Sequence, residues 1–594
     1  MIILGINVSH GASASLMING EIILAFQEER FNKIKNFVGY PKNSIQECIK
    51  YVEKKGLEID HAAFSTVKNP VFPFKYPLDN FFSIENWLDY YNKDFFSKEK
   101  KIKDVIKKIN YLKKFKKINQ YLNYSKIHKK DYFDNYKIFR DLQEDYLLYQ
   151  AKGLIKNISF LDHHTCHAYY AAYAPNIKEN KIGVLTLDSE GDGLNQTFWI
   201  LDKKKNKLKK INSSGECDIA RIYRFITLIL KMKPNEHEYK VMGLAPYAKN
   251  NFSEKVFKEV FKDILQVKNC MIVHKRRPKN LFNFLYNKTK GHRFDNIAGG
   301  VQMFVEDISS KLIIQIMKKY KLSSFAISGG VSMNIKMNKN LLSISKVKNI
   351  YVPPTGTDES LSIGACYYVN KFNNNQYLKN IYLGQKLHDA KITKKKIYEI
   401  LKDKKNYIVK EKFTHRNLAK LLNKGKIIGV ARDREEFGAR ALGNRSIIAN
   451  PSINGIIQKI NEQIKNRDFW MPFALTILNE KHKKIIKNPK SVDCDFMTLG
   501  FDTQSKSYQM IKNGTHPYDK TVRPQILKKE FNKKYHSLLS EFYKISKIPA
   551  LLNTSLNLHG LPISSKLEDV LYTFKESELE YLYINDNILI EKVF

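Results

Sequence analysis

The opening of the chain constrains its fold more than any other stretch. An apolar run, Ile2–Ile6, leads into a small polar loop, and a second run, Ala14–Ile18, ends at Asn19–Gly20. A third apolar run follows from Glu21 to Phe26. Asn-Gly between apolar runs is the strongest short-range signal for a β-hairpin. We therefore expect strand, polar loop, strand, tight turn and strand, at the start of an α/β domain.

The length of the chain shows that this opening belongs to one domain of several. At 594 residues, the chain exceeds what a single hydrophobic core holds, so at least two domains are expected. The opening pattern is typical of an actin-like ATPase domain, which we place at 1–375. A polar, Asn-rich linker is expected near 370–390. A second α/β unit is expected at 390–594, with an early strand at Lys426–Ala431. No stretch of sequence repeats an earlier one.

Residues 80–150 differ from the rest of the first domain. The stretch Lys98–Lys130 contains thirteen lysines, with apolar residues at helical spacing between them. This pattern predicts an inserted helical segment, which is placed to cap an acceptor site. Two interpretations of the lysines stay open: they bind an anionic acceptor, or they form a solvated face that follows from codon composition.

Charge and cysteine usage bear on partners and compartment. The net charge is +42, which raises nucleic acid and anionic membranes as partners. The excess is mostly lysine and accompanies abundant Asn, Ile, Tyr and Phe, as AT-rich coding produces. We therefore expect no nucleic-acid partner and no membrane insertion. Six scattered cysteines without a CxxC pair, and a start without a basic leader region, favour a cytoplasmic protein.

Two histidines and two carboxylates form a candidate metal site. The stretch Asp162–His167 reads DHHTCH and precedes a plausible helix, so His163 and His167 share one helix face while His164 points elsewhere. Asp188 follows a predicted strand, and Asp358 precedes a helix rich in small residues. Two histidines with carboxylates and no thiolates suit Fe(II) or Mn(II). The alternative is a pair of buried, hydrogen-bonded histidines.

Three loops have the composition of a nucleotide cradle. They are 7–13, 188–193 and 328–334, and each follows a predicted strand. Glycine lets backbone N–H groups approach phosphate, and a following helix N-terminus favours the anion. The segment 238–247 adds Lys240, which is suited to neutralise phosphate. The candidate nucleotide-binding residues are Asn7, Ser9, Gly191, Ser328, Gly329, Gly330 and Asn334.

The second unit carries an unusual density of arginine among glycine and apolar residues. The segment 432–446 reads RDREEFGARALGNRS, and further cationic groups follow it. Arginine binds carboxylate or phosphate oxygens in a bidentate manner. These residues are therefore expected to converge on a site for anions.

Together these stretches resemble the NodU/CmcH family of O-carbamoyltransferases, which includes the tobramycin and cephem enzymes. The resemblance covers nearly the whole chain except the lysine-rich insertion. It implies a first domain similar to the tRNA threonylcarbamoyl-transferase fold and a second similar to YrdC. The stretches that carry it are 5–15, 28–30 (EER), 163–167 (HHTCH), 239–247 (YKVMGLAPY), 328–334 (SGGVSMN), 353–360 (PPTGTDES), 437–451 (FGARALGNRSIIANP), 523–525 (RPQ) and 551–557 (LLNTSLN).

The resemblance also implies a reaction. The second domain would form carbamoyladenylate from carbamoyl phosphate and ATP, the latter with Mg²⁺, and the first would pass the carbamoyl group to a hydroxyl of a sugar or secondary metabolite. Iron would be held by His163, His167, Asp188 and Asp358. His10 is the candidate general base, and Lys240 and Arg440 are the other candidate catalytic residues. The implied residues for carbamoyl phosphate and ATP are Arg440, Arg445, Lys465, Arg467, Arg523, Asn553 and Ser555.

Other functions stay open at this point. One is tRNA threonylcarbamoylation, since both domains resemble enzymes of that pathway. Another is an actin-like scaffold that binds ATP without chemistry. The chain departs from the common family pattern at Ala439, where proline is frequent, and at Ser189, where glycine is frequent. The second departure weakens the case for Asp188 as a ligand. The oligomeric state is open, and a homodimer is among the possibilities.

Overall fold

The strands predicted at the N-terminus are confirmed in the computed structural model, which describes residues 1–68, 84–85, 87–88, 136–371 and 375–593. Asn19 and Gly20 both have positive φ, at 49° and 83°, as the predicted tight turn requires. The hairpins are antiparallel, and two further strands join in parallel. The strands in spatial order are β3 (Glu21–Gln27), β2 (Ser13–Ile18), β1 (Ile2–Asn7), β4 (His61–Phe64) and β5 (Ile158–Phe160).

A second five-stranded sheet has the same topology. Its first three strands pair antiparallel in sequence, and its last two join in parallel on the other side of the first. No stretch of the sequence repeats an earlier one, so this duplication is a repeat of topology alone. The strands in spatial order are β8 (Lys207–Ser214), β7 (Leu194–Asp202), β6 (Lys181–Gly191), β11 (Ser324–Ser328) and β12 (Asn349–Tyr351).

Two helices link the sheets. α9 (His163–Tyr173) follows β5 but packs on the second sheet, and α16 (Leu361–Asn370) follows β12 but packs on the first. The two helices also pack on each other. They approach closely at Gly364, where an added Cβ would lie 2.0 Å from the carbonyl oxygen of Cys166. The helix that follows the last strand of each sheet thus packs on the other sheet, and the starts of both helices meet between the sheets.

The remaining helices of the N-terminal unit surround this centre. Within the lysine-rich insertion, the structure describes only 84–85, 87–88 and the stretch from 136 onward, so Lys98–Lys130 lies outside the described residues. A two-stranded ribbon, β9 (Leu265–Lys268) and β10 (Met271–His274), lies beside β8. The helices are α1 (Glu29–Asn32), α2 (Lys42–Lys54), α8 (Tyr136–Ala151), α10 (Ile219–Ile229), α11 (Glu238–Leu244), α12 (Asn250–Val256), α13 (Leu281–Thr289), α14 (Phe294–Tyr320) and α15 (Ile335–Ser343).

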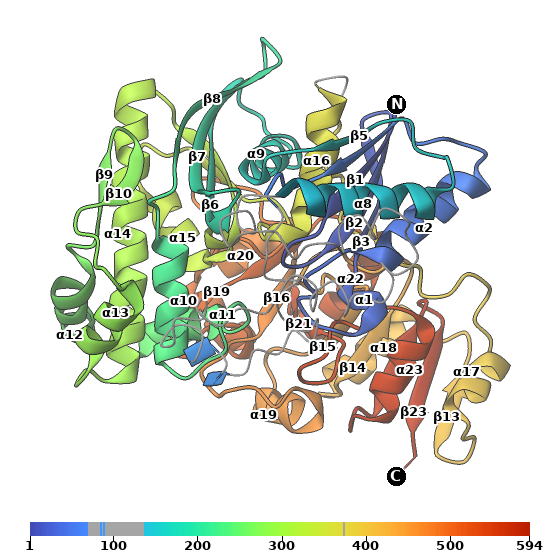
Figure 1. Ribbon diagram of the computed structural model, residues 1–594. Coiled ribbons are helices and arrows are strands. Elements are labelled where there is room, and N and C mark those ends of the chain that lie inside the picture. The colour runs from blue at the N-terminus through green and yellow to red at the C-terminus, as the bar shows by residue number, and fades with distance from the viewer. Residues whose placement is uncertain (69–83, 86, 89–135, 372–374, 594) are drawn as a thin grey trace.

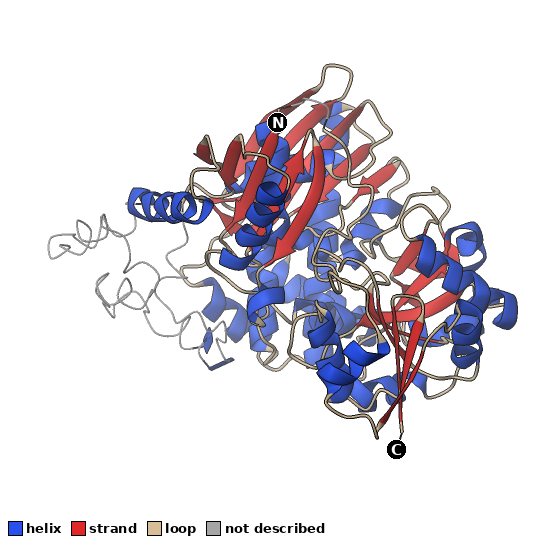
Figure 2. Cartoon of the chain, turned by 90° about the vertical axis from the view of Figure 1, so that its right-hand side faces the viewer, coloured by secondary structure: helices blue, strands red, loops and turns tan. Residues whose placement is uncertain are grey.

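The C-terminal unit has an eight-stranded mixed sheet, which lies below the first two sheets in Figures 1 and 2. The strand expected at Lys426–Ala431 is confirmed as β14. In spatial order the strands are β13 (Tyr407–Lys410), β23 (Ile588–Lys592), β22 (Tyr581–Ile584), β14 (Ile428–Ala431), β15 (Arg445–Ala449), β21 (Ala550–Ser555), β16 (Ala474–Leu478) and β20 (Pro524–Leu527). The described chain is therefore mixed α/β throughout, while the boundaries at 375 and 390 stay predictions.

A small sheet and short helices complete this unit. The three-stranded sheet comprises β17 (Ile486–Lys487), β18 (Phe501–Thr503) and β19 (Thr521–Val522). The helices are α17 (Lys394–Leu401), α18 (His415–Asn423), α19 (Ile456–Ile460), α20 (His482–Ile485), α21 (Tyr508–Ile511), α22 (Lys533–Ser546) and α23 (Leu567–Lys575).

All six cysteines lie in the described part of the chain, where each is buried and outside any disulfide. Among the described helices, none is both long and apolar enough to cross a bilayer.

Candidate functional site: a cavity between two charged clusters

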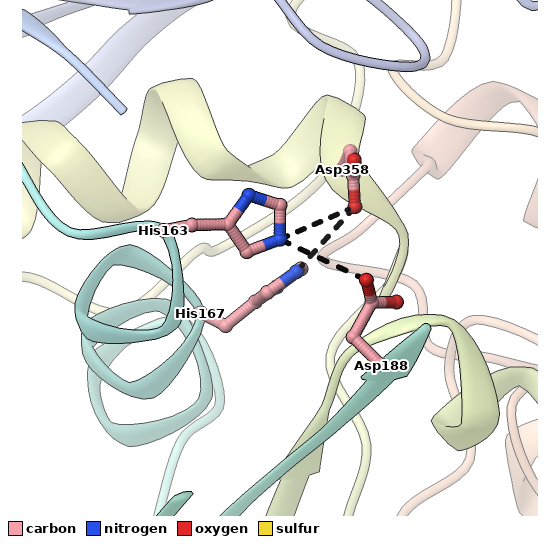
Figure 3. A group of neighbouring side chains, drawn as sticks. All are labelled: His163, His167, Asp188 and Asp358. Carbon is pink, nitrogen blue, oxygen red and sulfur yellow. Dashed lines mark ion pairs between the residues drawn. The ribbon is translucent and has the colours of Figure 1, made fainter. Parts of the chain in front are cut away.

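The four residues predicted to hold a metal converge where α9, β6 and the segment before α16 meet (Figure 3). Nε2 of His163 lies 3.8 Å from Oδ2 of Asp188 and 3.7 Å from Oδ1 of Asp358. Nε2 of His167 lies 3.5 Å from the same Asp358 oxygen. One ligand atom from each residue falls within 4.8 Å of all the others. We call these four residues the His–Asp cluster.

Neighbouring groups hold three members of the His–Asp cluster in place. Ser328 Oγ is 3.2 Å from Nδ1 of His167, so the Nε2 atom faces the cluster. The backbone N–H of Gly330 donates to Asp188 at 2.8 Å, and the Ser9 hydroxyl donates to Asp358 at 2.9 Å. Contacts of this kind orient ligands and are typical of metal sites.

Charge and unsatisfied atoms distinguish this cluster from a hydrogen-bonded histidine pair. Nε2 of both His163 and His167 is buried without a hydrogen-bond partner in the described part of the chain. Burial by itself lowers the pKa of His163, but Asp358 and Asp188 outweigh it and raise that pKa to about 9. Two orphaned imidazole nitrogens facing two carboxylates fit a divalent cation, which would bind all four groups.

His164 lies outside the cluster, as its spacing predicted. One ring nitrogen is 2.7 Å from Oγ1 of Thr186, and the other is 3.0 Å from the carbonyl oxygen of Leu194. Burial and the charges of His163 and His167 lower its pKa to about 3, so this ring is neutral.

The predicted loop 188–193 is strand over its first four residues, and a turn at 192–193 follows. β6 continues to Gly191, with an irregular register against β7 between Leu187 and Gly191. A Cβ at Gly191 would lie 2.2 Å from Cδ2 of His163, so only glycine leaves room for this ring. Gly191 therefore shapes the His–Asp cluster.

All three predicted nucleotide loops contact the His–Asp cluster, through Ser9, Gly191 and Gly330. Asn7 accepts from the backbone N–H of Ser9 at 3.1 Å, and so shapes the loop that reaches Asp358. Gly329 has φ of +92° and lies tight against Leu187. Asn334 caps α15 by accepting from the N–H of Met337.

A cavity of about 530 Å³ lies between the two units. The N-terminal unit contributes His10, Lys240, Gly330 and Asn334, and the His–Asp cluster contributes its two carboxylates. Lys240 is held across the cavity wall by an ion pair of 2.8 Å with Asp468. The other predicted residues of the N-terminal unit lie behind this wall: Asn7, Ser9, His163, His167, Gly191, Ser328 and Gly329.

Four cations of the C-terminal unit line the same cavity: Arg440, Lys465, Arg467 and Arg523, which we call the cation group. Burial lowers the pKa of Arg523 well below its usual value, and repulsion from Arg440 and Arg467 lowers it further. Burial and Arg467 do the same for Lys465. No ion pair in the described part of the chain involves the three arginines, and Nε of Arg440 is buried without a partner. Such a group is suited to receive an anion.

Local contacts fix the position of individual members of the cation group. The ammonium of Lys465 donates to Asn557 Oδ1 at 2.8 Å and to Ser555 Oγ at 3.2 Å, and both partners line the cavity. Arg467 donates to Oγ1 of Thr554 at 3.0 Å, and its guanidinium lies 5.0 Å from the ring centre of Phe473.

Two residues predicted to bind substrate lie elsewhere. The guanidinium of Arg445 is fully buried and donates to backbone carbonyls of Arg432, Asp433, Asn444 and Ser565. Asn553 donates to Ala441 O at 3.1 Å and to Thr476 Oγ1 at 3.0 Å, inside the sheet. Neither residue lines the cavity. Both hold together the loop and strands that carry the cation group.

Sequence reasoning missed several cavity residues. Glu238, Tyr239 and Asp468 line the cavity but were not selected. Two of them are neighbours of Lys240, and the third follows Arg467 directly, so their positions beside selected residues were the available signal. Burial raises the pKa of Glu238, although its carboxylate accepts from the N–H of Asn235 at 2.7 Å.

Comparison with known proteins covers both units. Residues 2–367 match the family Carbamoyltransferase N-terminus, and residues 419–592 match Carbamoyltransferase C-terminus. An uncharacterized protein of Methanocaldococcus jannaschii is 29% identical over the full length of both chains. Nodulation protein NolNO of Sinorhizobium fredii is 25% identical, over 98% of this chain and 79% of that protein.

Solved structures are more distant. Full-length HypF in its phosphate- and nucleotide-bound form is 14% identical over 63% of this chain and 56% of that one, with a TM-score of 0.36, which is too low to assign a shared fold. The two family matches span the His–Asp cluster and the cation group respectively, and nodulation proteins are among the relatives. This chain therefore belongs to the NodU-type family of carbamoyltransferases, and it is an enzyme that transfers carbamoyl groups.

Proposed function

We propose that this carbamoyltransferase activates carbamoyl phosphate at the cation group and transfers the carbamoyl group beside the His–Asp cluster. The observation that carries the proposal is the single cavity, which is lined by Arg523 and its neighbours on one side and by Asp188 and Asp358 on the other. An activated intermediate formed at one cluster would reach the other without leaving the protein. Enclosure of this kind limits hydrolysis of a reactive acyl group.

The first step would form carbamoyladenylate. Water cleaves carbamoyl phosphate to carbamate and phosphate, and a carbamate oxygen then attacks the α-phosphorus of ATP, so that pyrophosphate leaves. All the species handled here are anions. Arg440, Arg467 and Arg523, with Lys465, supply unpaired positive charge for them, and Mg²⁺ bound to ATP would neutralise part of the remainder.

The second step would transfer the carbamoyl group. The acceptor hydroxyl attacks the carbamoyl carbon, the bond from that carbon to the AMP oxygen breaks, and the hydroxyl proton passes to a base. His10 lines the cavity and is the candidate base. The hydroxyl belongs to a sugar or a secondary metabolite in this proposal.

The His–Asp cluster would hold the metal, with Fe(II) as the proposed ion. Its two imidazoles and two carboxylates match the ligands that Fe(II) prefers, and two of the donor atoms have no hydrogen-bond partner in the described chain. When bound, a divalent ion supplies a Lewis acid for an oxygen of the carbamoyl group. The chain's own contribution is orientation: Ser9, Ser328 and Gly330 fix the ligands from behind.

The finer fold assignment forms part of the proposal. Two sheets of identical topology that exchange their last helices support an actin-like domain in the N-terminal unit. The mixed sheet of the C-terminal unit would then be the YrdC-like activating domain.

The test is a pair of assays on purified full-length protein. Exchange of labelled pyrophosphate into ATP should require carbamoyl phosphate, because only the first step is reversed. Incubation with labelled carbamoyl phosphate, ATP and a panel of sugars should then yield AMP and a labelled acceptor. Absence of exchange with every divalent metal supplied would refute activation at the cation group. A requirement for threonine and tRNA would instead establish threonylcarbamoylation.

A further inference from the structure

Side chains of the N-terminal unit line the same cavity as the cation group of the C-terminal unit. Tyr239, in the first turn of α11, lines the cavity, and so does Lys35. The residue after Tyr239, Lys240, pairs with Asp468 at 2.8 Å. Asp468 directly follows Arg467, so this ion pair holds the start of α11 against the loop that carries a member of the cation group.

The hydroxyl of Tyr239 is available to a ligand. Its side chain is 37% exposed, and none of the hydrogen bonds within the described chain involves its hydroxyl. The ring is held edge-on to His237, with ring centres 6.3 Å apart. A phenol whose hydroxyl makes no hydrogen bond within the described chain can donate to an anion.

Both residues line the cavity that the cation group also lines. Burial lowers the pKa of Arg440, Arg467 and Arg523, and the phenol of Tyr239 acts in the opposite direction on all three. Burial and Arg467 lower the pKa of Lys465, and Lys35 lowers it further. Tyr239 and the three arginines line one cavity, and Lys35 and Lys465 line it with them.

We infer that the anion site is composite: Tyr239 donates a hydrogen bond to a phosphate oxygen held by Arg440, Arg467 and Arg523, while Lys35, which pairs with Glu236 at 4.0 Å, adds a cation to the same cavity. The inference rests on the proposed function. It alters one consequence of that function, because activation then depends on the N-terminal unit as well. The phosphate oxygen belongs either to carbamoyl phosphate or to ATP, and both present the same acceptor chemistry.

The decisive variant is Tyr239→Phe in the full-length protein, measured by carbamoyl phosphate-dependent ATP–pyrophosphate exchange. Removing only the hydroxyl should raise one KM by about ten- to hundredfold, the range for a hydrogen bond to a charged group. A rise in the KM for carbamoyl phosphate assigns the oxygen to that substrate, and a rise in the KM for ATP assigns it to the nucleotide. Bound metal should be unchanged.

The matched control is Tyr247→Phe, which removes a phenol oxygen a few residues further on, outside the cavity lining, and keeps the ring contacts of Tyr247 with His516 and Tyr518. Its KM values should equal those of the wild type. Wild-type exchange with both KM values unchanged in Tyr239→Phe would overturn the composite site. A wild-type protein without exchange would instead refute the proposed function, so the two failures are distinguishable.

Discussion

The two clusters that line the cavity bury charge in opposite ways. In the His–Asp cluster the charges attract one another: the carboxylates raise the pKa of His163, and the histidines hold the pKa of Asp188 and Asp358 below the usual range despite burial. In the cation group the charges repel one another, and the pKa of Arg523 and of Lys465 falls. The charges of the His–Asp cluster are neutralised by its own members, whereas the cation group has no counter-ion among its members.

This difference bears on both stability and function. A buried charge without a partner costs free energy, so the cation group destabilises the ligand-free protein and gains that free energy back when an anion binds. The His–Asp cluster costs less free energy without a ligand, because its members already neutralise one another. Substitutions in the two clusters should therefore shift stability in opposite directions.

The largest expected effect comes from the His–Asp cluster. The double variant His163→Ala with His167→Ala should lose bound divalent metal, and carbamoyl transfer should fall to the background rate. Pyrophosphate exchange should persist, because activation takes place at the cation group. Elemental analysis of the purified protein and the two assays check this. Unchanged metal content would show that the cluster is not the metal site.

The next effect comes from the cation group. Arg523→Ala should lower pyrophosphate exchange by about a hundredfold, since it removes charged hydrogen bonds to the anion. The ligand-free variant should nevertheless unfold at a higher temperature than the wild type, because repulsion at the site is relieved. The exchange assay measures the first change, and scanning calorimetry of the ligand-free protein measures the second. A lower unfolding temperature in the ligand-free variant would show that repulsion in the cation group does not destabilise the protein.

Arg445→Ala tests whether the hydrogen-bond partners of a buried arginine, and not the residue type, decide if its removal stabilises or destabilises the protein. Like that of Arg523, its guanidinium is buried, but it donates to four backbone carbonyl oxygens. Removing it should destabilise the protein by about 3–5 kcal/mol. Denaturant unfolding followed by circular dichroism gives the value. A stabilised variant would mean that burial of any arginine here is unfavourable, whatever its partners.

The smallest effect concerns a group behind the His–Asp cluster. Ser9→Ala removes the hydroxyl that donates to Asp358 at 2.9 Å. Metal affinity should fall by about tenfold, which is typical for loss of one such contact. Competition with a chelator measures the affinity, and Ser452→Ala, at a hydroxyl bonded only within its own loop, is the matched control. Equal metal affinities in wild type and Ser9→Ala would show that the Ser9 hydroxyl does not orient Asp358 for metal binding.

Much of the cavity could be predicted from sequence, for identifiable reasons. His163 and His167 were found because an i, i+4 pair on a helix is a local pattern, and the helix does begin at His163. Arg467 and Arg523 were named because they match the substrate-binding positions of the carbamoyltransferase family that the chain resembles. Arg445 was named for the same reason, and its backbone partners come from segments as distant as Ser565. Nothing local separates a paired arginine from an unpaired one.

By itself, the sequence determined the strands, the hairpin at Asn19–Gly20, the start of α9 and the chemical types present at each cluster, because these depend on neighbours a few residues apart. Tertiary structure alone decided the rest. The duplicated topology of the two sheets left no trace in the sequence, since strand order depends on pairing between distant segments. Packing of α9 on α16 brings His163 to Asp358, and packing of the two units brings Tyr239 into the cavity that the cation group lines. Which charges are compensated depends on those approaches, and so does the division of the cavity into two sites.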